Sequence, residues 1–135
     1  MNYLTTFSEH TEYDMNKWKD KAEFKECVHK YAEKMGIKIK AIYLREMTTK
    51  WASCSTDGNL NFNCELLDME KDLGRYVIVH ELLHFKVPNH GKLWKSMMAA
   101  YLGDWEKLDN KLRAIHSISF AMTPDVKTNK FSRQK

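Results

Sequence analysis

The hydrophobic positions of the chain follow two spacings, and the first of these predicts helices. Between Met15 and Met35, apolar residues recur every three or four positions, which is the spacing of one helix face. These residues are Phe24, Cys27, Val28, Tyr31 and Met35. Gly36 follows directly, and glycine is the residue that most often ends a helix in the left-handed conformation. We therefore predict a helix over residues 15–35.

The second spacing is an alternation of apolar and polar residues, which predicts strands. Ile37–Leu44 reads IKIKAIYL, so one face of this strand would be exposed. Thr48–Leu67 predicts two more strands around the sequence TDGN, because Asp-Gly favours a tight hairpin turn. A two-residue turn at Asp57–Gly58 would pair Cys54 with Asn61.

Helical patterns fill the rest of the chain. A long helix is expected over Met69–Lys86, with Asp68 as its N-cap, and it is apolar nearly all round, as a central buried helix would be. Two shorter helices are expected over His90–Leu102, ended by Gly103, and over Trp105–Ile115. The order of one helix, three strands and further helices predicts an α+β fold with one small sheet.

Composition and charge fix the number of domains and the class of protein. The chain has 135 residues and is 43% hydrophobic, which fits a single domain with a real core. Residues 123–135 hold four basic residues and one acid, which leaves a net charge of only +1 for the rest of the +4 total. We expect a domain over residues 1–122 and a disordered basic tail over residues 123–135. Nucleic-acid binding is disfavoured, and the tail is the one segment that would offer it.

Cysteine usage and apolar stretches indicate the cellular compartment. The three cysteines are an odd number without a CxxC pair, which favours free thiols in a reducing environment. No stretch has the roughly 18 to 20 apolar residues of a membrane span, and the first residues do not resemble a signal peptide. We therefore expect a cytoplasmic location and no membrane partner.

Titratable groups interrupt the apolar run YVIVHELLHFKVPNH, which spans residues 76–90. On a helix, His84 lies about 40° round from His80 and about 6 Å further along the axis, so both imidazoles can reach one metal ion. Glu81 lies beside that position, where a carboxylate can take a proton from a water that the metal activates. Histidines in the middle of a buried helix need a strong partner, and a divalent ion is one.

A catalytic zinc ion usually has three protein ligands and water, so the two histidines leave one ligand to be found. His90 is favoured, because Val87 and Pro88 could bend the chain back toward the helix. The alternatives are the carboxylates of the next helix, Asp104, Glu106 and Asp109. Tyr101 and His116 are candidates for polarising a substrate carbonyl, although structural roles are favoured for both.

Several short motifs of the chain together resemble the YgjP-like metallopeptidases, which are minimal zincins. The resemblance covers about residues 50–105 and rests on four segments: KWASCS (Lys50–Ser55), GNLNFNCELL (Gly58–Leu67), YVIVHELLHFKVPNH (Tyr76–His90) and GKLW (Gly91–Trp94). An Asp-Trp pair at residues 104–105 also matches. Lys50, Ala52 and Cys64 depart from the residues usual in the family, which affects the hairpin and the fit of a substrate.

The resemblance implies a zincin-like domain whose three-stranded sheet packs on an active-site helix carrying HExxH. It implies that His80, His84 and His90 bind Zn²⁺ and that Glu81 is the catalytic base for hydrolysis of a peptide or protein substrate. Three alternatives remain at this point. One is an SprT-like protease that acts on nucleic-acid-associated proteins. The others are a zinc-stabilised binding module without activity and a metal hydrolase of a non-peptide amide.

The tail gives a first testable prediction. Deletion of residues 123–135 should leave the melting temperature of the protein unchanged within a few degrees, because this segment has few apolar groups to bury. Thermal unfolding of the truncated and the full-length chain measures this. A melting temperature lowered by more than that would show that the tail packs on the domain.

Overall fold

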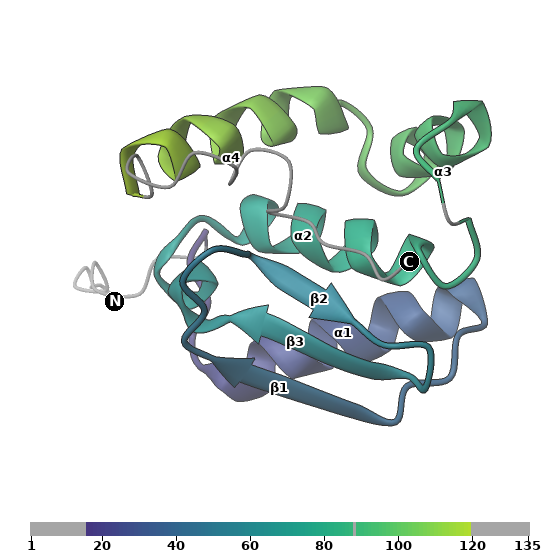
Figure 1. The fold of residues 1–135 in the computed structure, drawn as a ribbon, viewed down its shortest axis with the longest axis horizontal. Coiled ribbons are helices and arrows are strands. Elements are labelled where there is room, and N and C mark those ends of the chain that lie inside the picture. Colours follow the sequence, from purple (N-terminus) through teal and green to yellow (C-terminus); the bar gives the residue numbers. More distant parts are fainter. Residues whose placement is uncertain (1–15, 88, 120–135) are drawn as a thin grey trace, which may run out of the picture.

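The helix that carries the HELLH sequence lies at the centre of the molecule (Figure 1). In this computed structural model, which describes residues 16–87 and 89–119 and the side chains up to residue 115, that helix is α2 (Lys71–Leu83). Ten of its thirteen residues are buried, from Leu73 to Leu83 with Arg75 as the exception. The sheet and α1 lie on one side of α2, and α3 and α4 lie on the other (Figure 1). The prediction of a central buried helix is confirmed.

The sheet has three short strands, as predicted, in the order β1-β3-β2. Strand β1 (Ala41–Arg45) runs parallel to β3 (Asn59–Asn63), and β2 (Ala52–Cys54) runs antiparallel to β3. The hairpin partners are therefore neighbours, and the first strand joins on the far side of β3. Strand β2 is left at the edge of the sheet that lies nearest to α2 (Figure 1).

The predicted pairing across the hairpin is wrong by one residue. Cys54 pairs with Leu60, where a two-residue turn would have paired it with Asn61. The backbone N–H of Ser55 donates to the carbonyl of Asn59, so the loop has three residues. Gly58 is the last residue of this loop and has a φ of 100°. A three-residue hairpin loop needs a residue with positive φ at this position, and glycine adopts it readily.

Helix α1 (Lys21–Met35) begins later than predicted. The side chain of Asp20 accepts a hydrogen bond from the backbone N–H of Glu23 and forms the N-cap, so residues 16–20 precede the helix. Its end at Gly36, with a φ of 71°, agrees with the prediction. The ring of Phe24 meets that of Phe62 edge-on at 5.1 Å, which packs α1 on the sheet.

The other element boundaries differ from the predictions for local reasons. A 3-10 helix, η2 (Cys64–Asp68), follows β3, so α2 is capped by Glu70 and not by Asp68. Strand β1 begins at Ala41, although the predicted alternation of exposed lysines and half-buried isoleucines holds from residue 37 onward.

Two helices complete the domain. Helix α3 (Lys92–Leu102) ends at Gly103 as predicted, and α4 (Trp105–Ser119) extends the predicted helix by four residues. A hydrogen bond of 2.7 Å from the hydroxyl of Tyr76 to Asp109 joins α2 to α4. Burial and the neighbouring Asp109 raise the pKa of Tyr76 well above its usual range. Arg113 donates to the second oxygen of Asp109 at 2.8 Å, so this carboxylate is held from both sides.

The expected fold class, α+β, is confirmed. None of the three cysteines forms a disulfide, as expected. No helix among residues 16–87 and 89–119 is long and apolar enough to cross a membrane. The predicted tail lies outside the described residues.

Gly74 gives a prediction about the packing of α2. A methyl group at this position would lie 2.7 Å from Nε1 of the nearly buried Trp18, which is too close for ordinary contact. Helix propensity alone would make Gly74→Ala stabilising by about 1 kcal/mol. We expect the clash to prevail and to lower the free energy of unfolding by about 1 to 3 kcal/mol.

Chemical denaturation measures this change. The matched control is the same substitution in a Trp18→Leu background, where the clash is relieved and the cost of Gly74→Ala should shrink. A Gly74→Ala protein more stable than its parent would show that Trp18 can make room for a methyl group at position 74.

Candidate metal centre

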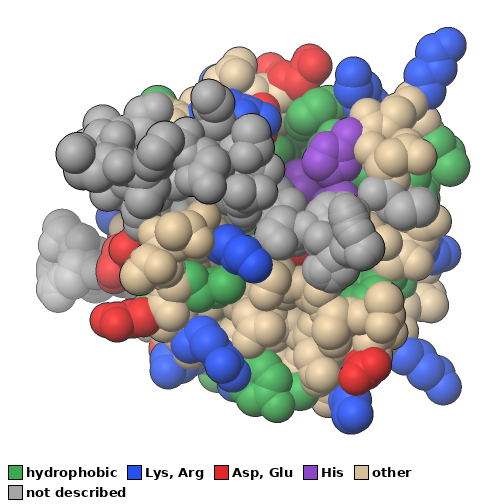
Figure 2. Space-filling model, viewed as in Figure 1, with side chains coloured by type: hydrophobic (Ala, Val, Ile, Leu, Met, Phe, Trp, Pro, Cys, Tyr) green, Lys and Arg blue, Asp and Glu red, His purple; other side chains and the backbone are tan. Residues whose placement is uncertain are grey.

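Three histidines meet at the C-terminal end of α2. One ring nitrogen from each of His80, His84 and His90 lies within 4.8 Å of the other two, so the three could hold a metal ion. Their burial differs, because His80 is buried, His84 is half-buried and His90 is exposed. Figure 2 shows histidine side chains at the surface on the face viewed in Figure 1. The cluster is therefore anchored in the core and opens toward solvent.

The spacing of the nitrogens fits a tetrahedral metal ion. Zinc–nitrogen bonds of 2.0 to 2.1 Å at tetrahedral angles would separate two ligand nitrogens by about 3.3 to 3.4 Å. Nε2 of His84 and Nε2 of His90 are 3.3 Å apart. The two nitrogens that lie furthest apart are within 4.8 Å of each other, so a small side-chain movement would bring them to the spacing of a tetrahedral site. Three imidazoles form a donor set that suits zinc and the neighbouring transition metals.

Glu81 lies beside the cluster and is not part of it. Its Oε2 is 3.7 Å from Nδ1 of His80, and its side chain has no exposed surface. One residue further along α2 than His80, it points about 100° away from the direction of that ligand. The carboxylate therefore lies next to His80 and outside the group that the three histidines form.

The end of α2 brings the third histidine back to the first two. The helix ends at Leu83, so His84 is its C-cap and the predicted continuation to residue 86 is a turn. The backbone N–H of Val87 donates to the carbonyl of Leu83 at 2.7 Å, and its side chain is buried. This bond holds the turn that follows α2, and His90, which comes three residues later, groups with His80 and His84.

The carboxylates that were alternatives to His90 have other roles in the structure. Asp109 accepts hydrogen bonds from Tyr76 and Arg113. Asp104 accepts from the backbone N–H of Lys107 at 3.4 Å, and Glu106 is exposed on α4. Among the described residues, none of the three is grouped with the histidines.

None of the other described residues is grouped with the three histidines. Trp51, from the KWASCS segment, is fully buried in the hydrophobic core. The ring of Tyr101 meets that of Tyr31 on α1 edge-on at 6.4 Å, and the side chain of His116 lies outside the described part. The sequence analysis did not single out Trp94, whose ring lies 4.3 Å from that of His90. The sequence could have indicated this contact, because Trp94 follows His90 by four residues and lies on the buried face of α3.

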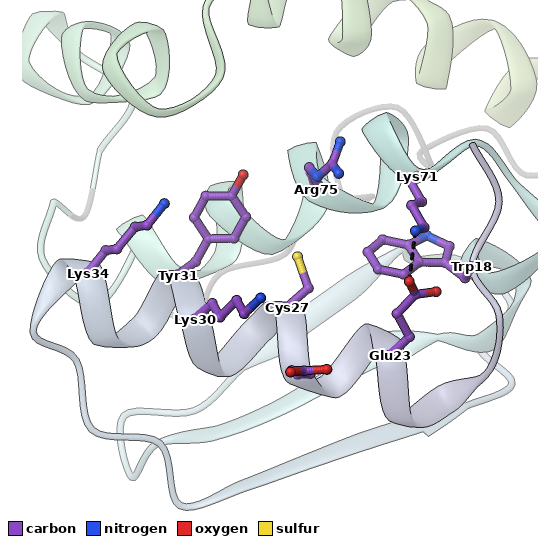
Figure 3. Close-up of a pocket in the computed structure, with 9 residues that line it drawn as sticks. Trp18, Glu23, Cys27, Lys30, Tyr31, Lys34, Lys71 and Arg75 are labelled. Carbon is purple, nitrogen blue, oxygen red and sulfur yellow. Dashed lines mark hydrogen bonds and ion pairs between the residues drawn. The ribbon is translucent and has the colours of Figure 1, made fainter. Parts of the chain in front are cut away.

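A separate hollow lies between α1 and α2 (Figure 3). It has a volume of about 260 Å³ and four basic side chains along its lining, which are Lys30, Lys34, Lys71 and Arg75. Arg75 precedes His80 by five residues, so it points about 140° away from the direction of that histidine. Lys71 pairs with Glu23 at 2.7 Å and lowers the pKa of that carboxyl, and Arg75 pairs with Asp72. This hollow is therefore distinct from the histidine cluster, and part of its charge is neutralised internally.

Comparison with known proteins identifies the family. Residues 8–115 match the model of the YgjP-like metallopeptidase domain, which covers most of the chain. The chain belongs to the YgjP-like metallopeptidase family. It is therefore a metal-dependent peptidase by family, and the resemblance seen in the sequence is confirmed. A comparison with curated proteins gave no match.

Two solved structures are similar to this YgjP-like domain. One is the metallopeptidase zymogen of Methanocaldococcus jannaschii jannalysin, with 27% identity and a TM-score of 0.59 over 70% of this chain and 96% of that one. The other is the metallopeptidase zymogen of Pyrococcus abyssi abylysin, with 14% identity and a TM-score of 0.59 over 67% of this chain and 92% of that one. The second likeness shows the fold alone. The match covers almost the whole length of both neighbours, so the shared fold makes up nearly all of each of those chains.

The cluster predicts how the YgjP-like domain responds to metal. We expect one divalent ion per chain and a melting temperature that rises with added zinc, because a ligand that binds only the folded state stabilises it by mass action. When the free zinc concentration is a thousand times the dissociation constant, the free energy of unfolding rises by about 4 kcal/mol. His84→Ala should abolish both effects.

His29→Ala is the matched control, because His29 is an exposed histidine on α1 far along the chain from the cluster. Elemental analysis and thermal unfolding with and without chelator measure the response. Metal retained at full stoichiometry by His84→Ala would contradict the assignment.

Proposed function

We propose that this protein is a zinc-dependent peptidase in which His80, His84 and His90 bind the ion and Glu81 is the general base. The observation that carries the proposal is the convergence of three imidazole nitrogens within 4.8 Å beside a buried carboxylate. A purely structural zinc site is usually closed by four protein ligands and needs no adjacent glutamate. Three ligands and a carboxylate are what a hydrolytic site requires.

Zinc bound there would supply a Lewis acid that polarises the scissile carbonyl and lowers the pKa of water to near neutral. The protein's own part is proton transfer and positioning. Glu81 would take a proton from the attacking water at a carboxylate oxygen and deliver it to the leaving nitrogen of the peptide. Its place on α2 next to His80, with Oε2 3.7 Å from Nδ1 of that histidine, would hold the carboxylate beside the reacting groups.

The sheet supplies a place for the substrate backbone. Strand β2 is at the edge of the sheet and lies beside α2 (Figure 1). An extended peptide can add to such an edge as a further strand, with main-chain hydrogen bonds fixing its direction. A peptide that added to β2 in this way would be bound along the edge of the sheet that lies beside α2, which favours a peptide or protein over a small amide as the substrate.

The proposal predicts the effect of Glu81→Gln. The substitution keeps the size of the side chain and removes the base, so hydrolysis should fall by about 10² to 10⁴-fold. Zinc content should remain at the parental level, because Glu81 is outside the ligand set. Cleavage of a peptide library, followed by mass spectrometry, measures the activity, and elemental analysis measures the zinc.

Glu106→Gln is the matched control, because it makes the same chemical change at an exposed position on α4 and should leave activity unchanged. Parental activity in Glu81→Gln would show that another group is the base. If the parent binds zinc stoichiometrically and cleaves nothing in the library, the alternative of a zinc-stabilised binding module replaces the proposal.

A further inference from the structure

The third histidine has the least local support of the cluster. His80 and His84 belong to α2 and to its C-cap, whereas His90 lies in the segment between Leu83 and Lys92 and is exposed. A side chain outside a helix has more conformational freedom, and metal binding must remove that freedom. A neighbour that holds the ring in place before the metal arrives would therefore raise the affinity.

Trp94 is that neighbour. It lies in the first turn of α3, it is 2% exposed, and its ring lies 4.3 Å from the ring of His90 at an interplanar angle of 34°. The two rings are therefore in close, tilted contact. The same indole meets His80 edge-on at 5.1 Å, so it contacts two of the three candidate ligands.

The core holds Trp94 rigidly from its other side. Its ring meets the ring of Trp105, the first residue of α4, at 5.2 Å and an angle of 82°. Its contacts therefore reach α2, the segment before α3, and α4. Because the ring cannot turn away without disturbing these contacts, it can fix the plane of His90.

A tryptophan at position 94 lowers the stability of the fold in one respect, and packing alone does not explain why the residue is there. Its Nε1 is buried and has no hydrogen-bond partner among the described residues. A phenylalanine would fill much of the same space without burying an unpaired donor, which is destabilising. What the indole adds is a larger and more electron-rich face toward His90.

We propose that Trp94 is a positioning residue for His90 and that it strengthens binding of the metal. An imidazole bound to a divalent cation is electron-poor, and the negative face of an indole attracts it more strongly than it attracts a free imidazole. The contact between the Trp94 and His90 rings therefore stabilises the metal-bound protein. In the metal-free protein it also holds the His90 ring in the position that metal binding needs. This inference rests on the proposed metal site.

The test measures zinc affinity by competition with a chromophoric chelator and ligand geometry by the absorption of the cobalt-substituted protein. Trp94→Met should weaken zinc binding by about 10 to 100-fold, the range typical when a residue that orients a ligand is lost. It should also change the cobalt spectrum, because the plane of His90 is no longer fixed. Trp94→Phe keeps a ring face, and its loss should be smaller, below about tenfold.

Met98→Ala is the control for packing. Met98 is fully buried on the same helix and lies one turn beyond Trp94. Its truncation should lower the melting temperature of the metal-free protein and leave zinc affinity and the cobalt spectrum unchanged. In a His90→Ala background, Trp94→Met should have little further effect on affinity, because Trp94 acts through His90.

Parental affinity in Trp94→Met would overturn the inference, as would an equal loss of affinity in Met98→Ala. If Trp94→Met does not fold, Trp94→Phe decides, and an affinity equal to the parent's overturns the inference. A parent that binds no zinc at all would instead overturn the proposed function, so the two failures can be told apart.

Discussion

The site depends on one constraint, which is that polar ligand groups must be held inside an otherwise apolar helix. His80 and Glu81 are buried in α2 among leucines and valines, where unpartnered polar groups are costly. The structure meets this constraint by placing the two residues next to each other and next to two further imidazoles. The sheet, α1 and α4 enclose the rest of α2, so the helix cannot move to relieve the burial. A metal ion held at the cluster would bind the three imidazoles together.

The end of the helix matters as much as its interior. Because α2 stops at Leu83, His84 lies at the C-cap, where the backbone leaves the helix, and the hydrogen bond from Val87 to Leu83 holds the turn that follows. Two of the three candidate ligands therefore belong to α2 and its C-cap, and the third follows in the segment before α3. This third histidine, His90, is the most exposed of the three, and an aromatic ring on α3 lies against it.

Much of this arrangement could be predicted from the sequence, and the misses have physical causes. The apolar pattern of α2 predicted its burial, and HExxH predicted that His80 and His84 meet, since both follow from helical period alone. The register of the hairpin was wrong by one residue, because Asp57–Gly58 fits a loop of two or of three residues. The parallel pairing of β1 with β3 was not predicted, because alternation along a strand shows its faces and not its partner. Residue spacing left His90 and three carboxylates as alternatives, and only the tertiary path of the chain groups His90 with the other two.

The most direct test of this account is an anomalous diffraction map of zinc-loaded crystals. The account predicts one zinc peak, bound by a nitrogen of His80, His84 and His90 at 2.0 to 2.1 Å, with Glu81 outside the coordination sphere and beside the fourth position. A peak elsewhere in the molecule, or a carboxylate of α4 in the place of His90, would contradict it.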